Sequence, residues 1–496
     1  MDVVLPISSA AGIVLAPPLA MRIVVILIAA TLISSCATDD RPVRDSIRAE
    51  VEASNFPAHV ARDKEGQQLW TKTVSFYRAR AFAPVWLRDR RATANLHALT
   101  AAIKGSARDG LDPRLYDLAF IDGLSANGRK RFSEGAAGEI DTRLTYTYLR
   151  LSSDLANGVS ALARSHPAWR MRPQTFDPTA HLTTAISDEE IAKSLDALKP
   201  ATREYRALAG LLADYRRRAD QGQPDTGMDR VALAQRIRQV ELNMERWRWI
   251  PRENPARHIV VNIPAFRLEV WEGDAVALSM RVVVGKKDTP TPIFIDKLTH
   301  VVFSPYWNVP PTIAKDETLP SALGDPSFLQ RTNMEILDDK GKVVDPASID
   351  VDRAGDYRFR QRPGKGNALG LVKFMFPNEF NVYLHDTPAD SLFARATRLF
   401  SHGCVRVEDP QALAEYLLRE RPEWTRERIV EAMNAGEERT VKLLEAVPVY
   451  IGYWTVDITP DGQPVFLPDV YGLDSRQAAL LNEAAAAPAH PARASR

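Results

Sequence analysis

The chain carries the segment FSHGCVR at residues 400–406, and a histidine, His385, lies nineteen positions before its cysteine. A thiol becomes a nucleophile near neutral pH when a neighbouring base takes its proton, or when a cation lowers its pKa from about 8.5. Gly403 has no side chain and lets a carbonyl group approach the backbone closely. The N–H groups around Gly403 and Cys404 are then placed to face a developing oxyanion. The segment predicts a covalent cysteine acyl-transfer site.

The residues alone leave other interpretations of this cysteine open. A lone cysteine is most often a small buried apolar residue. A zinc ion held by His385, His402 and Cys404 is a second possibility, but structural zinc sites commonly contain C-x₂-C or H-x₃-H pairs, and the chain has none. A serine acyl-enzyme of the penicillin-binding type needs an S-x-x-K motif, which the chain also lacks.

The sequence around the two residues resembles the L,D-transpeptidase signature, which marks the YkuD-type catalytic domain. The resemblance rests on YLHDTP (383–388), SLF (391–393) and RLFSHGCVR (398–406). Further blocks resemble the same domain in their usual order: VNIPAFRL (261–268), VG (284–285), TP (291–292) and PYWNVP (305–310). PGKGNALG (363–370) and KFMFPN (373–378) resemble the large periplasmic members that cross-link peptidoglycan.

Roles for the histidines follow from this pattern. Side chains alternate along a strand, so Tyr383 and His385 are expected on one face of a strand over 381–385. We expect His385 to be the base that takes the Cys404 proton, with its ring oriented by the backbone carbonyl of Asp386. His402 is the weaker catalytic candidate, and bracing of the loop by a hydrogen bond is the favoured alternative for it.

The remaining site residues are expected to support the loop or the substrate. Ser401 is expected to hold the turn. Arg406 is a candidate partner of a substrate carboxylate through its planar fork, with a salt bridge to Glu408 or Asp409 as the alternative. Tyr383 and Trp307 are expected to line the substrate groove, although core packing is the default role for Trp307.

Composition agrees with an extracytoplasmic enzyme. Lysine plus arginine number 64 and aspartate plus glutamate 63, so no large electrostatic field favours a nucleic acid or a membrane surface. At 496 residues and 45% hydrophobic content, the chain can form two or three domains with a sizeable core. With a single catalytic thiol, no internal disulfide is needed.

The second cysteine, Cys36, predicts the location. A positive start at Met21 and Arg22 precedes an apolar run over 23–33, which is too short to span a bilayer but is typical of a secretory signal. The sequence LISSC (32–36) resembles a bacterial lipobox, which implies lipidation of Cys36 and a periplasmic protein anchored in the outer membrane. On this interpretation the natural start is Met21, and residues 1–20 are an over-extended start. The alternative to lipidation of Cys36 is an ordinary secretory signal that is cleaved elsewhere.

Residues 37–57 are polar and predict a tether, and residues 58–251 predict a helical domain. Apolar residues recur at three- and four-residue steps, as in one face of a helix, at 96–103, 144–155 and 233–247. FY (76–77), PVWL (84–87) and GLDP (110–113) resemble the scaffold domain of the large L,D-transpeptidases. Those relatives often carry an inserted peptidoglycan-binding domain where this chain has a short basic linker at 216–227, so binding to the wall must rest on the other domains.

From residue 258 the period changes to two, which predicts strands. Residues 259–263 and 276–284 predict an antiparallel hairpin, and 447–472 a closing one. Asp409 and Pro410 predict the start of a helix over 411–419. The fold class is therefore a mainly α-helical scaffold domain followed by a mainly-β (α+β) catalytic domain over 258–475. By resemblance, a capping subdomain is inserted at about 310–366. Residues 476–496 predict a disordered tail.

The resemblance implies a two-step reaction on peptidoglycan, with neither metal nor organic cofactor. Cys404 attacks the carbonyl at the L-centre of diaminopimelate in a tetrapeptide donor stem and releases D-alanine. The amine of diaminopimelate on an acceptor stem then takes the acyl group, which gives a 3→3 cross-link. Attachment of a protein to the wall, D-amino-acid exchange and hydrolysis share the same acyl-enzyme and stay open, as does a non-catalytic wall-binding lipoprotein. Carbapenems are expected as covalent inhibitors, and nucleic acid is not expected as a partner.

Overall fold

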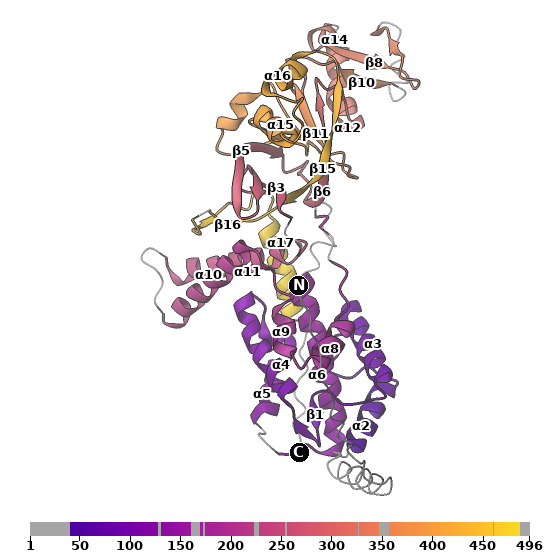
Figure 1. The fold of residues 1–496 in the computed structure, drawn as a ribbon, viewed down its shortest axis with the longest axis vertical. Coiled ribbons are helices and arrows are strands. Elements are labelled where there is room, and N and C mark those ends of the chain that lie inside the picture. Colours follow the sequence, from indigo (N-terminus) through magenta and orange to yellow (C-terminus); the bar gives the residue numbers. More distant parts are fainter. Residues whose placement is uncertain are drawn as a thin grey trace, which may run out of the picture. The chain divides into compact units, whose positions relative to one another are not determined.

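The computed structural model describes residues 40–126, 130–159, 169–171, 174–222, 228–252, 255–325, 327–346, 357–459 and 461–486 (Figure 1). The expected signal peptide with Cys36 and the last ten residues of the expected tail lie outside this part of the chain. The chain divides into two compact units, Met1–His97 with Leu124–Tyr146, and Ala98–Gly123 with Thr147–Arg496.

The first unit consists of helices and one two-stranded sheet. Its elements are α2 (Arg41–Glu52), α3 (Lys64–Ala79), β1 (Leu87–Arg88), β2 (Arg91–Ala92) and the N-terminal parts of α4 (Ala94–Gly105) and α6 (Glu134–Asn157). The buried carboxylate of Asp141 accepts hydrogen bonds from the Tyr77 hydroxyl at 2.6 Å and from the N–H groups of Val85, Trp86 and Leu87. Burial raises the pKa of this carboxyl to about 6 despite these donors. Asp141 thus fixes the PVWL loop to α3 and α6.

The second unit begins with helices and short 3₁₀ turns. These are η2 (Ser106–Asp109), η3 (Pro113–Tyr116), α5 (Leu118–Ala126), α8 (Pro178–Ser187), α9 (Ile191–Asp196), α10 (Arg203–Asp220) and α11 (Arg230–Trp247). The helix predicted to end before Pro251 is α11, which Asp229 caps by accepting a hydrogen bond from Ala232 N–H at 2.7 Å. The apolar stripes predicted at 96–103 and 144–155 are buried in α4 and α6. None of the helices in the described ranges combines the length and the apolar character that a membrane span requires.

A nine-stranded sheet forms the main part of the second unit. Its order is β13-β5-β14-β12-β11-β6-β15-β3-β4, and β4 also pairs with β5, so that the sheet closes on itself. The strands are β3 (Arg257–Asn262), β4 (Arg267–Glu272), β5 (Ala275–Gly285), β6 (Phe294–Phe303), β11 (Val372–Met375), β12 (Leu384–His385), β13 (Leu399–Ser401), β14 (Val405–Val407) and β15 (Arg439–Gly452).

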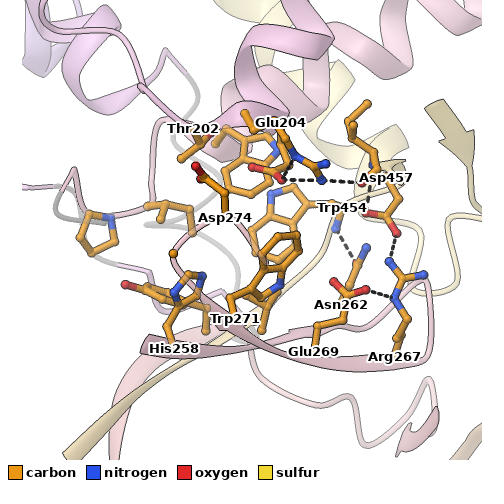
Figure 2. Close-up of a pocket in the computed structure, with 18 of the residues that line it drawn as sticks. Thr202, Glu204, His258, Asn262, Arg267, Glu269, Trp271, Asp274, Trp454 and Asp457 are labelled. Carbon is orange, nitrogen blue, oxygen red and sulfur yellow. Dashed lines mark hydrogen bonds and ion pairs between the residues drawn. The ribbon is translucent and has the colours of Figure 1, made fainter. Parts of the chain in front are cut away.

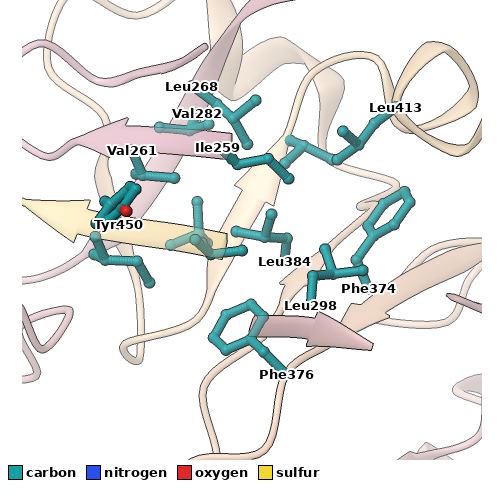
Figure 3. Close-up of a cluster of buried hydrophobic side chains, with 14 of the residues drawn as sticks. Ile259, Val261, Leu268, Val282, Leu298, Phe374, Phe376, Leu384, Leu413 and Tyr450 are labelled. Carbon is teal, nitrogen blue, oxygen red and sulfur yellow. The ribbon is translucent and has the colours of Figure 1, made fainter. Parts of the chain in front are cut away.

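One face of this sheet packs into the main core (Figure 3). The core takes alternate residues from each strand, such as Val261, Val282, Phe374 and Leu384, and the helices α15 (Pro410–Leu418) and α16 (Arg426–Asn434) add to it. Asp409 caps α15 by accepting a hydrogen bond from Ala412 N–H at 2.9 Å, as predicted.

A second, smaller sheet lies within the segment expected to form a cap. Its order is β7-β10-β8-β9, and the segment also contains short helices. The elements are β7 (Trp307–Asn308), α12 (Pro311–Ile313), η4 (Ala314–Thr318), α13 (Leu319–Gly324), α14 (Phe328–Arg331), β8 (Met334–Leu337), β9 (Val343–Val344) and β10 (Arg358–Gln361). They enclose an apolar cluster of their own. The expected architecture of helical part, mainly-β domain and insertion is confirmed.

The strand predictions need two corrections. The turn at 272–274 joins β4 to β5, and β3 pairs with β4, so three strands replace the predicted hairpin. The closing hairpin is shorter than predicted and consists of β16 (Val456–Ile458) and β17 (Pro464–Phe466), because residues before it belong to the long strand β15.

Two segments that looked unstructured are helices. Residues 41–52 of the predicted tether form α2, because Val43, Ile47 and Val51 make a buried face. The predicted disordered tail begins inside α17 (Leu473–Ala486). There Gln477 is buried and accepts a hydrogen bond from Arg246 at 2.9 Å. In both cases the segment is helical because it buries a narrow face, although its polar or alanine-rich composition predicted no regular structure.

Candidate active site

Strands β11, β12 and β14 lie side by side and present the candidate residues on one face. Leu384 pairs with Phe374 on one side and Val405 on the other, and all three belong to the main core. Because side chains alternate along a strand, the residues between them point away from that core. The face opposite the core therefore gathers Tyr383, His385, Cys404 and Arg406.

The thiol of Cys404 lies beside Tyr383. The thiol donates to the carbonyl oxygen of Asn381, with Sγ and the oxygen 3.7 Å apart, and the Tyr383 hydroxyl is close enough to interact electrostatically with the sulfur. Burial raises the pKa of the Cys404 thiol, and burial together with the neighbouring sulfur raises the pKa of the Tyr383 hydroxyl. The free protein therefore holds a protonated thiol rather than a thiolate near neutral pH.

The imidazole of His385 is buried and held in one tautomer. Its Nδ1 is 2.5 Å from the carbonyl oxygen of Asp386, which can only accept, so Nδ1 carries the proton and Nε2 is left as the basic atom. Burial, and then the charge of Arg406, lower the pKa of His385 to about 3. The ring stands edge-on to Tyr383, with centroids 5.7 Å apart. No hydrogen bond joins His385 to Cys404 within the described residues, so proton transfer requires a small movement.

Ser401 ties the catalytic turn together. Its hydroxyl donates to the Cys404 carbonyl at 2.5 Å and accepts from the Gly403 N–H at 3.1 Å. Gly403 has a φ of 120°, which an L side chain rarely adopts, and its carbonyl accepts from Thr291 at 2.8 Å. Since the Gly403 N–H is already engaged, the Cys404 N–H is the stronger candidate donor to an oxyanion.

His402 points away from the thiol and does not brace its own loop. Its Nε2 lies 2.7 Å from Glu317 Oε1, and Glu317 belongs to η4 in the inserted segment. The side chain of His402 is 32% exposed, whereas His385 is 4% exposed. The hydrogen bond of His402 therefore links the turn to the inserted segment, where bracing within the loop itself was expected.

Two family models match the chain, one for an L,D-transpeptidase catalytic domain of the YkuD family over residues 256–451 and one for a Scaffold domain over 71–212. Residues 256–451 are an L,D-transpeptidase catalytic domain. A Haemophilus influenzae protein named "Putative L,D-transpeptidase" is 39% identical over 236 residues, 47% of this chain and 47% of that protein. The chain thus spans about half the length of the curated relative that it matches.

Two solved structures of mycobacterial L,D-transpeptidases align more weakly. The enzyme from Mycobacterium smegmatis is 14% identical, with a TM-score of 0.19, over 40% of this chain and 58% of its own. L,D-transpeptidase 1 of Mycobacterium tuberculosis is also 14% identical, with a TM-score of 0.16, over 40% of this chain and 61% of its own. At these TM-scores the assignment to the family rests on the sequence matches alone.

In the L,D-transpeptidase domain Arg406 makes neither of the ion pairs considered for it. Glu408 pairs with Arg281, and Asp409 caps α15. On the other side of His385 lies Lys373, which pairs in register with it across β11 and β12. Lys373 could not be recognised as a site residue from the motifs, because the register between two strands is not visible in a single motif.

The two remaining site residues have structural contacts. Trp307 is partly buried against the apolar cluster of the inserted segment. The Asp386 carboxylate accepts from the N–H groups of Leu371 and Thr387, both at 2.7 Å, and burial raises its pKa. Asp386 thus acts on His385 through its backbone carbonyl. Within the described residues no group of three or more histidine, cysteine or acidic side chains is arranged to hold a metal ion.

A separate pocket of about 100 Å³ lies where α10 and α11 meet β3, β4 and β16 (Figure 2). It contains three tryptophans, and its charged groups pair with one another: Arg267 with Glu269 at 2.8 Å and with Asp457 at 2.5 Å. None of the candidate catalytic residues of the L,D-transpeptidase domain lines it.

The raised pKa of Cys404 predicts how the thiol reacts in the free protein. We expect alkylation by iodoacetamide to be slow at pH 7 and to increase through a midpoint above about 8.5, the ordinary value for cysteine. Peptide mapping by mass spectrometry over a pH series separates Cys404 from Cys36, and urea-unfolded protein serves as the control with an ordinary midpoint. A midpoint at or below pH 7 would instead indicate a preformed thiolate.

Proposed function

We propose that the protein is a peptidoglycan L,D-transpeptidase that forms 3→3 cross-links between diaminopimelate residues through an acyl-thioester on Cys404. The observation that carries the proposal is the sheet face on which Cys404, Tyr383, His385 and Arg406 lie together, with the core on the other side. The family match supports acyl transfer on peptide stems of peptidoglycan.

In the first step the sulfur attacks the carbonyl carbon at the L-centre of diaminopimelate. Because the thiol is protonated and His385 is neutral, the proton passes to Nε2 as the C–S bond forms. The Cys404 N–H and the Tyr383 hydroxyl, which lie beside the sulfur, are the candidate donors to the developing oxyanion. The C–N bond then breaks, and the same proton leaves on the amine of D-alanine.

In the second step the amine of diaminopimelate on another stem attacks the thioester. His385 takes a proton from this amine, the C–S bond breaks and the thiol is restored. Protein attachment, D-amino-acid exchange and hydrolysis differ only in the acceptor. The scaffold and capping blocks resemble those of cross-linking members, which favours the 3→3 product.

Muropeptide analysis of purified sacculi incubated with the protein tests this directly. We expect new dimers linked between two diaminopimelate residues, together with released D-alanine. Monomeric tripeptides without dimers would assign the protein as an L,D-carboxypeptidase. Intact mass after exposure to a carbapenem distinguishes a wall-binding protein without catalysis, which would gain no adduct.

We also propose that the protein is anchored in the outer membrane through a lipid on Cys36, which the LISSC sequence supports. Replacing Cys36 with alanine is expected to leave the protein unlipidated and to release it from the outer-membrane fraction, with catalysis in solution little changed. Membrane fractionation and metabolic labelling with palmitate measure both effects. Wild-type protein found soluble in the periplasm would contradict the anchor.

A further inference from the structure

The proposed reaction handles two amines of the same chemical class. The group released in the first step is a D-α-amino acid, and the group that attacks in the second is the D-centre of diaminopimelate. Each has a carboxylate one carbon away from the reacting nitrogen. One anion site at a fixed distance from the thiol is therefore able to position both groups in turn.

The sheet face carries two cations, Lys373 and Arg406, at a distance from the thiol that suits such an anion site. Lys373 pairs in register with His385, and His385 pairs in register with Arg406, so the three form a row across β11, β12 and β14. With strands about 4.8 Å apart, the Cα atoms of Lys373 and Arg406 are about 10 Å apart. Cys404 lies two residues before Arg406, about 7 Å along the strand. A carboxylate above His385 would lie between the two side chains.

The charges of this row are poorly compensated within the protein. Arg406 makes no ion pair among the described residues, and its Nε is buried without a partner. Lys373 is 15% exposed and has Glu438 at 3.9 Å, while the same carboxylate oxygen accepts from the Tyr306 N–H at 2.8 Å. The imidazole between the two cations is neutral. A partly buried cation without an ion pair, as Arg406 is, favours an anionic ligand, and Lys373 has only the 3.9 Å contact with a carboxylate that is already engaged.

We propose that Lys373 and Arg406 form a carboxylate site that binds the D-α-amino acid leaving group and then the D-α-amino acid acceptor. This inference rests on the proposed function and specifies its acceptor. In the transfer step the acceptor nitrogen forms a bond to the acyl carbon, the C–S bond breaks, and the proton lost by nitrogen returns to sulfur through His385. Water has no carboxylate and gains nothing from the site, so the site favours transfer over hydrolysis.

Acceptor exchange tests the site, with the full-length protein, a tetrapeptide donor, and either D-methionine or D-methioninamide as acceptor. Amidation lowers the pKa of the amine, so chemical reactivity by itself favours the amide. We expect the wild-type protein to prefer the free acid, through a lower acceptor KM. Lys373→Met should reduce the preference for the acid over the amide about 10- to 100-fold, the value of a hydrogen bond to a charged group, because slower acylation by the donor lowers both transfers alike.

Three controls make the comparison specific. Lys373→Arg keeps the cation and should keep the preference, which also covers the case in which Lys373→Met does not fold. Lys297→Met removes an exposed lysine from β6, several residues along the strand from the partner of Lys373, and should behave as wild type. Alkylation of Cys404 by iodoacetamide should proceed at the same rate in every variant, because the nucleophile is untouched.

The outcomes separate the two proposals. The carboxylate site would be overturned if the wild-type protein used the acid and the amide equally well, or if Lys373→Met kept the wild-type preference for the acid. Either result would leave acyl transfer in place. Absence of any exchange product and of D-alanine release in the wild-type protein would overturn the proposed function itself.

Discussion

Cys404→Ala should remove all release of D-alanine and all cross-linking while the fold stays intact. The acyl group has no other thiol to bond to within the described residues, because Cys404 is the free cysteine there. The side chain lies on the sheet face opposite the core, on a turn that Ser401 and Thr291 hold through backbone groups, so its loss leaves that turn supported. Chromatography of the peptides after incubation with a tetrapeptide donor measures turnover.

Cys404→Ser provides the matched comparison. A hydroxyl is a far weaker nucleophile than a thiolate, and a neutral imidazole activates it poorly, so we expect almost no turnover. Circular dichroism and thermal melting establish that both variants are folded. D-alanine release retained by folded Cys404→Ala would rule out the covalent mechanism.

Replacing His385 with alanine is expected to slow acylation by about two to four orders of magnitude, the usual value of a positioned general base. The Asp386 carbonyl fixes the tautomer that exposes Nε2, and no other ring nitrogen lies on this sheet face between Lys373 and Arg406 in the described chain. Because the pKa of His385 is about 3, the ring stays neutral as the pH falls from 7 to 5. We therefore expect acylation by the wild-type protein to show no loss from imidazole protonation in that range. Stopped-flow fluorescence with a carbapenem measures the rate.

His402→Ala is the control, since its ring is exposed and bonded to Glu317 rather than directed at the thiol. We expect a smaller rate loss, and an effect on thermal stability of at most about 1 kcal/mol, the value of an exposed pair. A larger loss in His402→Ala than in His385→Ala, with both folded, would exchange the roles of the two histidines.

The chemistry-bearing motif could be predicted from sequence because its information is local. Ser401, Gly403 and Cys404 form one turn, and the His385–Asp386 hydrogen bond joins adjacent residues. Apolar periodicity likewise predicted α11 and the buried stripes of α4 and α6, since a helix buries residues three and four apart. Such features need only the neighbouring residues and the period of the element.

Other features depended on residues far apart in the chain. Lys373 joins the site only through the register of β11 with β12, and His402 finds its partner in the inserted segment. The first residues of the predicted tail are helical because the buried Gln477 accepts a hydrogen bond from Arg246 of α11 at 2.9 Å, which composition does not reveal. By itself, therefore, the sequence determined the family of the domain, and it predicted the candidate nucleophile and the candidate base. Only the tertiary structure decided which cations flank His385 and which residues of the predicted tether and tail are helical, because strand register and burial arise from contacts between distant segments.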